Sequence, residues 1–268
     1  MFHLLTHGFF KALLFLGAGS VIHSTGKQDL SELGGLWRRM PLTTLTFGIG
    51  ALAMAGLPPL AGYWSKDELL LAIQHGQPVW VWGLAMFSAL LSAIYMARVT
   101  FGTFFGPLKH ENEHTHESPG VMTIPLLLLA IMAIAAGWWV FDQAGPLLGM
   151  PQKFGGFGTF LYLHEPEAFH FDTTLGITSA IIALLGLSVG SAYYWQRALS
   201  AEALAQRFAF IHRLLVNKYY MDHIYQWIID KIVLGFSNLI ALFDRLIVND
   251  KGVNGPAYLT ALAGDRMK

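Results

Sequence analysis

The chain has 268 residues, of which 54% are hydrophobic and only 13% are charged. Soluble domains usually carry about 25% charged residues, so this composition is typical of a polytopic membrane protein. The formal net charge is zero, which gives no support to nucleic-acid binding. The absence of cysteine excludes disulfides, thiolate metal sites and Cys-ligated iron–sulfur clusters in this chain.

The first apolar run, residues 1–23, predicts a membrane-spanning helix that carries a polar stripe. His3, His7 and Lys11 recur every four positions and therefore share one helix face. Lys11 lies near the middle of the span, where a lysine costs at least about 3 kcal/mol on insertion scales. The ordered triple therefore predicts a buried, protonatable relay. The alternative is a structural role, in which Lys11 extends to the membrane surface and the histidines pack against neighbours.

The second apolar stretch, residues 41–74, predicts a broken helix. At helical rise it would measure about 50 Å, which is too long for a hydrocarbon core of about 30 Å. The break is predicted between Gly56 and Gly62, because Pro58 and Pro59 remove two backbone donors. Discontinuous membrane helices line wet cavities and mark transport sites. The alternative is a Pro-Pro surface loop between two ordinary helices.

The residues after the break carry the next candidate groups. Ser65 followed by Glu68 predicts a capping box, with Ser65 as the N-cap of the second half-helix. Lys66 then lies in the first turn, where the helix dipole disfavours a cation. Lys66 and the adjacent Asp67 are the candidate titratable residues at the break.

Three further spans are predicted at residues 78–105, 121–141 and 175–195, which gives five crossings in a bundle over residues 1–196. With this topology most loop cations share one side of the membrane, which is cytoplasmic by the positive-inside rule. The loop cations on that side are Lys27, Arg38, Arg39, Lys109, Arg197, Arg207 and Arg213.

Two histidine-rich loops resemble metal sites but are explained equally well as solvated polar loops. One contains His110, His114 and His116, and the other contains His164, Glu165, Glu167 and His170. Neither provides a complete ligand set, so no metal site is predicted.

Residues 197–268 are predicted to form a linker and a lateral amphipathic helix on the cytoplasmic side. Between residues 222 and 248, apolar residues recur at helical spacing and charged residues fall largely on the other faces. Such a helix can lie along the membrane surface or along neighbouring proteins. The alternative is a short buried core helix.

Three segments together resemble one family. These are MFHLLTHGFFKALLFLGAGSVIH, GGLWRRMP and GALAMAGLPPLAGYWSKDELL, and they resemble the antiporter-like L subunit (subunit 5) of proton-pumping NADH-quinone oxidoreductase, respiratory complex I. The tail VNKYYMDHIYQWIID also resembles this subunit, and it favours the L type over its M and N relatives. Family members are longer, so the resemblance places this chain in their carboxy-terminal part.

The resemblance implies an all-α, polytopic membrane helix bundle with one Pro-broken helix and a lateral amphipathic helix at the C-terminus. It implies that His3, His7 and Lys11 relay protons, and that Lys66 and Asp67 lead to the exit half-channel. The FMN, iron–sulfur clusters and quinone are expected in partner subunits, alongside M- and N-type antiporter-like subunits, in a bacterial inner membrane. Two alternatives stay open: a subunit of a multi-subunit Na⁺/H⁺ antiporter, and a structural membrane subunit that conducts no ion.

Overall fold

The computed structural model describes residues 2–137, 172–196 and 200–267, and within these ranges the regular structure is entirely helical. The chain divides into two compact units, residues 1–200 and 201–268. The predicted all-α membrane fold is confirmed by the length and apolar composition of the helices.

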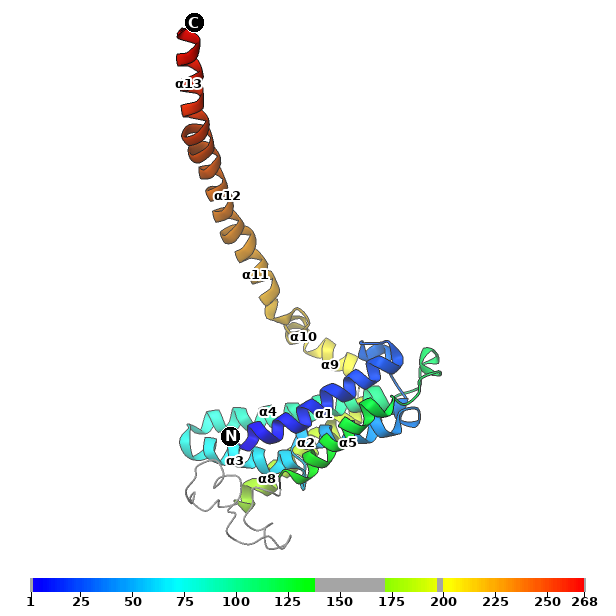
Figure 1. Cartoon of the computed structure of the whole chain (residues 1–268). Helices are drawn as coiled ribbons and strands as arrows, with labels where there is room; N and C mark the ends of the chain where they lie inside the picture. The colour runs from blue at the N-terminus through cyan, green and yellow to red at the C-terminus, as the bar shows by residue number, and fades with distance from the viewer. Residues whose placement is uncertain (1, 138–171, 197–199, 268) are drawn as a thin grey trace, which may run out of the picture. The chain divides into compact units, whose positions relative to one another are not determined.

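The first unit is a bundle in which long helices run alongside one another (Figure 1). Its principal helices are α1 (Phe2–Thr25), α2 (Pro41–Ala55), α3 (Ala61–Gly76), α4 (Val79–Thr100), α5 (Gly120–Ala135) and α8 (Thr173–Tyr194). A π-helical segment, Phe101–Phe105, continues α4. Short 3-10 segments in the loops are Leu30–Glu32, Leu36–Arg38 and His110–Asn112.

The predicted spans correspond closely to these helices. By length and composition, α1, α4 with its π-helical extension, and α8 can each cross a membrane, whereas α2 and α5 are apolar but shorter. The stretch 41–74 forms two helices, α2 and α3. The stretch predicted as 121–141 forms a helix only as far as Ala135, and residues 138–141 lie outside the described ranges.

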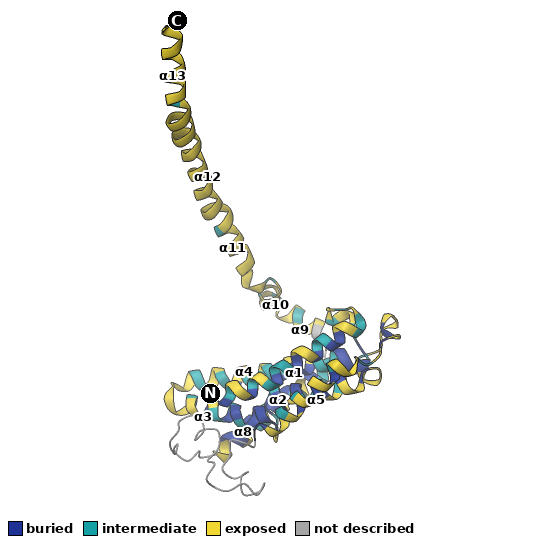
Figure 2. Ribbon diagram, viewed as in Figure 1, coloured by how far each residue is buried: buried dark blue, intermediate teal, exposed yellow. Residues whose placement is uncertain are grey.

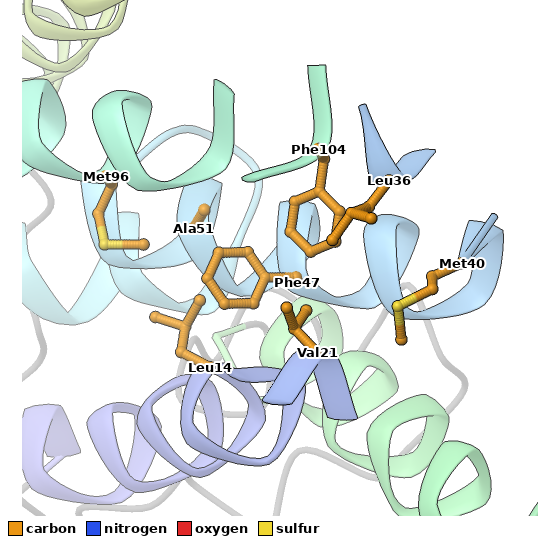
Figure 3. Packing of buried hydrophobic residues seen from close by; sticks show 8 residues of the cluster. All are labelled: Leu14, Val21, Leu36, Met40, Phe47, Ala51, Met96 and Phe104. Carbon is orange, nitrogen blue, oxygen red and sulfur yellow. The ribbon is translucent and has the colours of Figure 1, made fainter. Parts of the chain in front are cut away.

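The interior of the bundle is closely packed. Figure 3 shows one cluster, in which Leu14 and Val21 of α1 meet Phe47 and Ala51 of α2. The bundle also carries large apolar residues that are exposed, a surface that suits lipid contact, and Figure 2 colours exposed residues of every type yellow. Among these exposed side chains are Leu4, Phe15, Leu45, Leu84, Leu128 and Ile181.

Helices α4 and α8 approach each other through small residues. A Cβ added to Gly186 would lie 2.6 Å from the Cβ of Ala93, and one added to Gly190 would lie 2.4 Å from the Cβ of Ala97. Small residues of this kind allow close helix packing where lipid offers little hydrophobic driving force.

The second unit begins with two short helices, α9 (Ala201–Arg207) and α10 (Ala209–Val216), followed by one helical run, Lys218–Arg266. The run comprises α11 (Met221–Ile228), α12 (Leu234–Phe243) and α13 (Gly255–Arg266), joined by the π-helical segments Ile229–Val233 and Asp244–Asn254.

This run contains the helix predicted over residues 222–248 and extends beyond it. Its large apolar side chains are exposed within this chain, so the second unit by itself does not bury them in a core (Figure 2). By length and composition the run also qualifies as a membrane span, so its charges do not by themselves exclude a spanning helix. At about 74 Å, however, it is far longer than a core of about 30 Å requires.

Candidate functional site

The site is built around the break between α2 and α3. Gly56 ends α2 with φ 86° and ψ 38°, a left-handed conformation that glycine adopts without steric cost. The N–H of Gly56 donates to the carbonyl of Ala53, and that of Leu57 donates to the carbonyl of Leu52, both at 3.1 Å. This pair of bonds is the Schellman arrangement that terminates many helices.

The two prolines leave two carbonyls of α2 without backbone donors. In a continuous helix, residues 58 and 59 would donate to the carbonyls of Met54 and Ala55, but proline has no N–H. The ammonium of Lys66 donates to these same two carbonyls, at 3.2 Å and 3.4 Å. They lie at the C-terminal end of α2, where the helix dipole favours a cation.

The predicted capping box is wrong. Helix α3 begins at Ala61 after an extended Leu60, so Ser65 and Glu68 lie inside the helix. Lys66 therefore lies in the second turn, and the nearest helix terminus to its ammonium is the C-terminus of α2. The start of α3 approaches α2 closely, since a Cβ at Gly62 would lie 1.8 Å from the carbonyl oxygen of Ala53.

Ser65 connects the broken helix to α1 instead of capping α3. Its hydroxyl lies 2.7 Å from Oγ1 of Thr6 and 3.0 Å from Nδ1 of His3. Both Thr6 and Ser65 are fully buried. The sequence did not identify Thr6, although it lies one position from the stripe and carries a hydroxyl within an apolar run.

A cavity of about 260 Å³ lies between α1, α3 and α4. Its polar lining consists of His3, His7, Lys66, Ser88 and Ser92, and apolar side chains complete the wall. The rings of His3 and His7 are 5.8 Å apart between centroids, and the ammonium of Lys66 lies 3.5 Å from Oγ of Ser92. This volume has room for several waters with polar partners between the histidines and Lys66.

Lys11 does not line this cavity. Its side chain is half-buried, and its ammonium lies 5.9 Å from the ring centroid of Phe15. The structure therefore brings together His3, His7 and Lys66, and leaves Lys11 one turn further along α1.

Asp67 contacts a different helix from its neighbour Lys66. Its carboxyl is 4% exposed, and Oδ1 accepts a hydrogen bond from Oγ of Ser179 on α8 at 2.5 Å. Within the described ranges, Oδ2 has no hydrogen-bond partner. The two adjacent side chains thus connect the break to α2 and α4 on one side and to α8 on the other.

The histidine-rich loop before α5 forms local contacts. Nδ1 of His110 lies 3.1 Å from a carboxyl oxygen of Glu113. In the described part of the chain, no group of three or more His, Cys, Asp or Glu side chains is placed to hold a metal ion. The second loop, with His164 and His170, lies outside the described residues.

Comparisons with known proteins agree with this architecture. Residues 1–92 match the family described as "NADH:quinone oxidoreductase/Mrp antiporter, TM". This match covers α1, α2, α3 and the first part of α4. The resemblance indicated by the sequence motifs is confirmed over nearly the whole chain by homologous subunits of quinone oxidoreductases.

Two relatives are named for different compounds, NAD(P)H and F(420)H(2). The NAD(P)H-quinone oxidoreductase subunit 5 from Paulinella chromatophora is 35% identical, over 98% of this chain and 44% of the relative. The F(420)H(2) dehydrogenase subunit L from Methanosarcina mazei is 36% identical, over 100% of this chain and 42% of the relative. The chain therefore spans less than half the length of these relatives.

A solved structure shares the fold. A chain of the membrane-bound sulfane sulfur reductase, an archaeal respiratory membrane complex, matches 98% of this chain and 46% of its own length, with a TM-score of 0.60. Sequence identity is 20%, so this likeness bears on the fold alone.

Proposed function

We propose that this chain moves protons across a membrane as an antiporter-like part of a quinone-reducing respiratory complex. The observation that carries the proposal is the cavity at the helix break, where His3, His7 and Lys66 lie around one hydratable space. All three side chains can bind and release protons, and such groups within a membrane bundle mark ion pathways. Lys11 and Asp67 extend the proposed route from the cavity, along α1 and towards α8 respectively.

The titratable groups at the helix break can both bind and release a proton. The ammonium of Lys66 has three hydrogens for the carbonyls of Met54 and Ala55 and for Oγ of Ser92, and the neutral amine keeps two of them and gains a lone pair that can accept a proton. Histidine titrates near neutral pH when unperturbed, so His3 and His7 can exchange protons with waters in the cavity. None of these steps needs a redox group in this chain.

Electron transfer is assigned to partner subunits. One relative is named for NAD(P)H and another for F(420)H(2), yet both match this chain at similar identity. This supports a role that is independent of the electron donor. FMN and iron–sulfur clusters are placed in partners, since a chain without cysteine offers no thiolate ligands to a cluster. We also propose that M- and N-type antiporter-like subunits are partners of this chain and that the complex lies in a bacterial inner membrane.

A second candidate function is ion exchange in an Na⁺/H⁺ antiporter. The matching family is described by both classes, which favours keeping this alternative. Purification of the native assembly separates the two functions: quinone reductase activity and a bound flavoprotein support the first. An assembly without them that exchanges sodium for protons supports the second.

The test of proton transfer uses Lys66 in the assembled complex. Lys66→Met removes the titratable group, while Gly56, Pro58 and Pro59 still set the break. We expect assembly to persist and the ratio of protons pumped to electrons transferred to fall. Lys66→Arg should impair pumping as well, because arginine does not deprotonate in proteins. A parental ratio in the arginine variant would show that this position supplies only a fixed charge.

We further propose that the run Lys218–Arg266 lies laterally on the cytoplasmic side. Its exposed apolar residues need cover from lipid or from neighbouring subunits, and its length exceeds that of a single span. Single cysteines provide the test, because the chain has no native cysteine. Positions 226 and 238 should react with an impermeant thiol reagent from the cytoplasmic side, while 232 and 239 stay protected. Equal labelling at all four positions, or labelling only from outside, contradicts the proposal.

A further inference from the structure

The chain of contacts between Thr6, Ser65 and His3 restricts where the hydroxyl hydrogens can go. Oγ1 of Thr6 lies 2.7 Å from Oγ of Ser65 and 3.3 Å from the carbonyl oxygen of His3. Oγ of Ser65 lies 3.0 Å from Nδ1 of His3. Each hydroxyl has a single hydrogen to donate, and both hydroxyl groups are fully buried. A buried hydroxyl hydrogen without an acceptor costs about 1–3 kcal/mol, so complete arrangements are favoured.

Two arrangements satisfy every hydroxyl. In the first, Thr6 donates to Ser65 and Ser65 donates to Nδ1 of His3, so neutral His3 carries its proton on Nε2. In the second, Nδ1–H of His3 donates to Ser65, Ser65 donates to Thr6, and Thr6 donates to the carbonyl of His3. A protonated imidazole has hydrogens on both nitrogens and therefore fits only the second.

The geometry of the contacts selects the first arrangement for neutral His3. The 2.7 Å contact is oriented with Thr6 as the donor, which leaves the hydrogen of Ser65 for Nδ1. Nε2 then carries the hydrogen of neutral His3, and Nδ1 is the nitrogen that accepts a further proton.

We propose that Thr6 and Ser65 are positioning residues that set the tautomer of His3 and reverse together when His3 is protonated. This inference rests on the proposed proton-relay function. The added proton binds Nδ1 and stays on the ring, while the two hydroxyls only rotate. The Ser65 hydroxyl turns from Nδ1 towards Thr6, and the Thr6 hydroxyl turns towards the carbonyl of His3. Because Ser65 precedes Lys66 in α3, each protonation of His3 changes the hydrogen bonding of the broken helix itself.

The test measures the His3 tautomer in the assembled complex by infrared difference spectroscopy with ring-labelled histidine. The His3→Asn variant identifies the His3 bands by subtraction. The parent should show neutral His3 with its proton on Nε2. Thr6→Val keeps the shape of the side chain but removes the donor to Ser65. Without the Thr6 hydroxyl, the second arrangement leaves the Ser65 hydrogen without an acceptor, whereas the first still places it on Nδ1. The neutral bands should therefore stay those of Nε2–H, and His3 should be protonated about fivefold less readily than in the parent, which corresponds to one net hydrogen bond.

Two further variants control for packing. Thr6→Ser restores a hydroxyl and should restore the parental protonation of His3. Thr46→Val provides a matched control, because Thr46 is also fully buried but its hydroxyl donates only to backbone carbonyls of α2. It should leave the His3 bands unchanged.

Several outcomes overturn the inference. A parent with its proton on Nδ1, or a Thr6→Val variant in which His3 is protonated as readily as in the parent, contradicts the assigned arrangement. If Thr6→Val does not assemble, Ser65→Ala is measured instead, and a single parental tautomer there contradicts it equally. Failure of the proposed function is distinct, since His3→Asn would then pump protons at the parental ratio whatever the tautomer bands show.

Discussion

Two polar clusters lie at opposite ends of α1 and differ in how completely their groups are satisfied. The cavity cluster, defined by His3, His7 and Lys66, borders a space of about 260 Å³. The closed cluster is defined by Ser20, Thr43, Ser118 and Glu117. In the closed cluster, Ser20 lies 2.9 Å from Thr43 and 2.7 Å from Ser118, all between side-chain oxygens.

Glu117 completes the closed cluster from the loop before α5. Its carboxylate accepts hydrogen bonds from the backbone N–H groups of Leu42 and Thr43, at 2.7 Å and 3.2 Å, and from the Thr43 hydroxyl at 2.6 Å. It therefore caps the N-terminus of α2, which opens with Pro41 and has no cap from its own preceding residue.

The difference shows how one helix bundle can use polar groups in two ways. A network whose members are all satisfied stabilises one arrangement, because any change leaves a buried group unpaired. Protonatable groups around a cavity can instead exchange partners with water at small cost. Polarity alone therefore does not mark the site, whereas titratable side chains beside a hydratable space do.

The largest expected effect tests whether the cavity cluster extends along α1 towards the closed cluster. Lys11 lies between them without lining the cavity. Lys11→Ala should lower the ratio of protons pumped to electrons transferred while assembly is retained, because an intramembrane lysine is kept for function. Lys109→Ala, in an exposed loop, serves as the control. Pumping at the parental ratio in Lys11→Ala would limit the relay to the cavity residues.

A smaller effect is expected on stability rather than on pumping. Glu117→Ala removes the cap of α2 and should lower the free energy of unfolding by about 1–3 kcal/mol. Glu113→Ala changes an exposed carboxylate in the same loop, which pairs with His110, and should change it by less than about 1 kcal/mol. Thermal inactivation of the purified complex in detergent measures both variants. Equal losses of stability in the two variants would show that Glu117 stabilises the bundle no more than the exposed Glu113 does.

The smallest effect concerns an exposed ion pair between the two loops beside the closed cluster. Nζ of Lys27 lies 2.8 Å from a carboxyl oxygen of Glu111. The hydrogen bond with Glu111 raises the pKa of Lys27 above its ordinary value of 10.5, and the hydrogen bond with Lys27 lowers the pKa of Glu111 below 4.5. The stabilisation is therefore constant through neutral pH, lost as pH falls below about 4.5 through the lowered pKa, and lost again above about 10.5.

Glu111→Gln tests this pair. Its melting temperature should fall slightly relative to the parent at pH 7, and the difference should shrink with added salt and towards pH 4. A difference that grows on acidification would have the wrong sign for a carboxylate whose pKa is lowered.

By itself, the sequence determined the membrane class, the helical fold and the place where the second apolar stretch breaks. These follow from local physics: apolar runs of spanning length, and prolines that cannot donate hydrogen bonds. Periodicity also aligned His3 and His7 on one face. The helix over residues 222–248 followed from its apolar stripe, although local pattern did not reveal that the helix continues to Arg266.

The tertiary structure alone decided which groups meet. The S-x-x-E pattern predicted the N-cap at Ser65, but the N-cap of α3 is Leu60, five residues earlier, and the first turn of α3 packs closely on α2 at Gly62. Only that register brings the ammonium of Lys66 to the carbonyls of Met54 and Ala55 and the hydroxyl of Ser65 to α1. A pattern along one chain segment predicts its periodicity, whereas the partners across a helix interface depend on how separate segments pack.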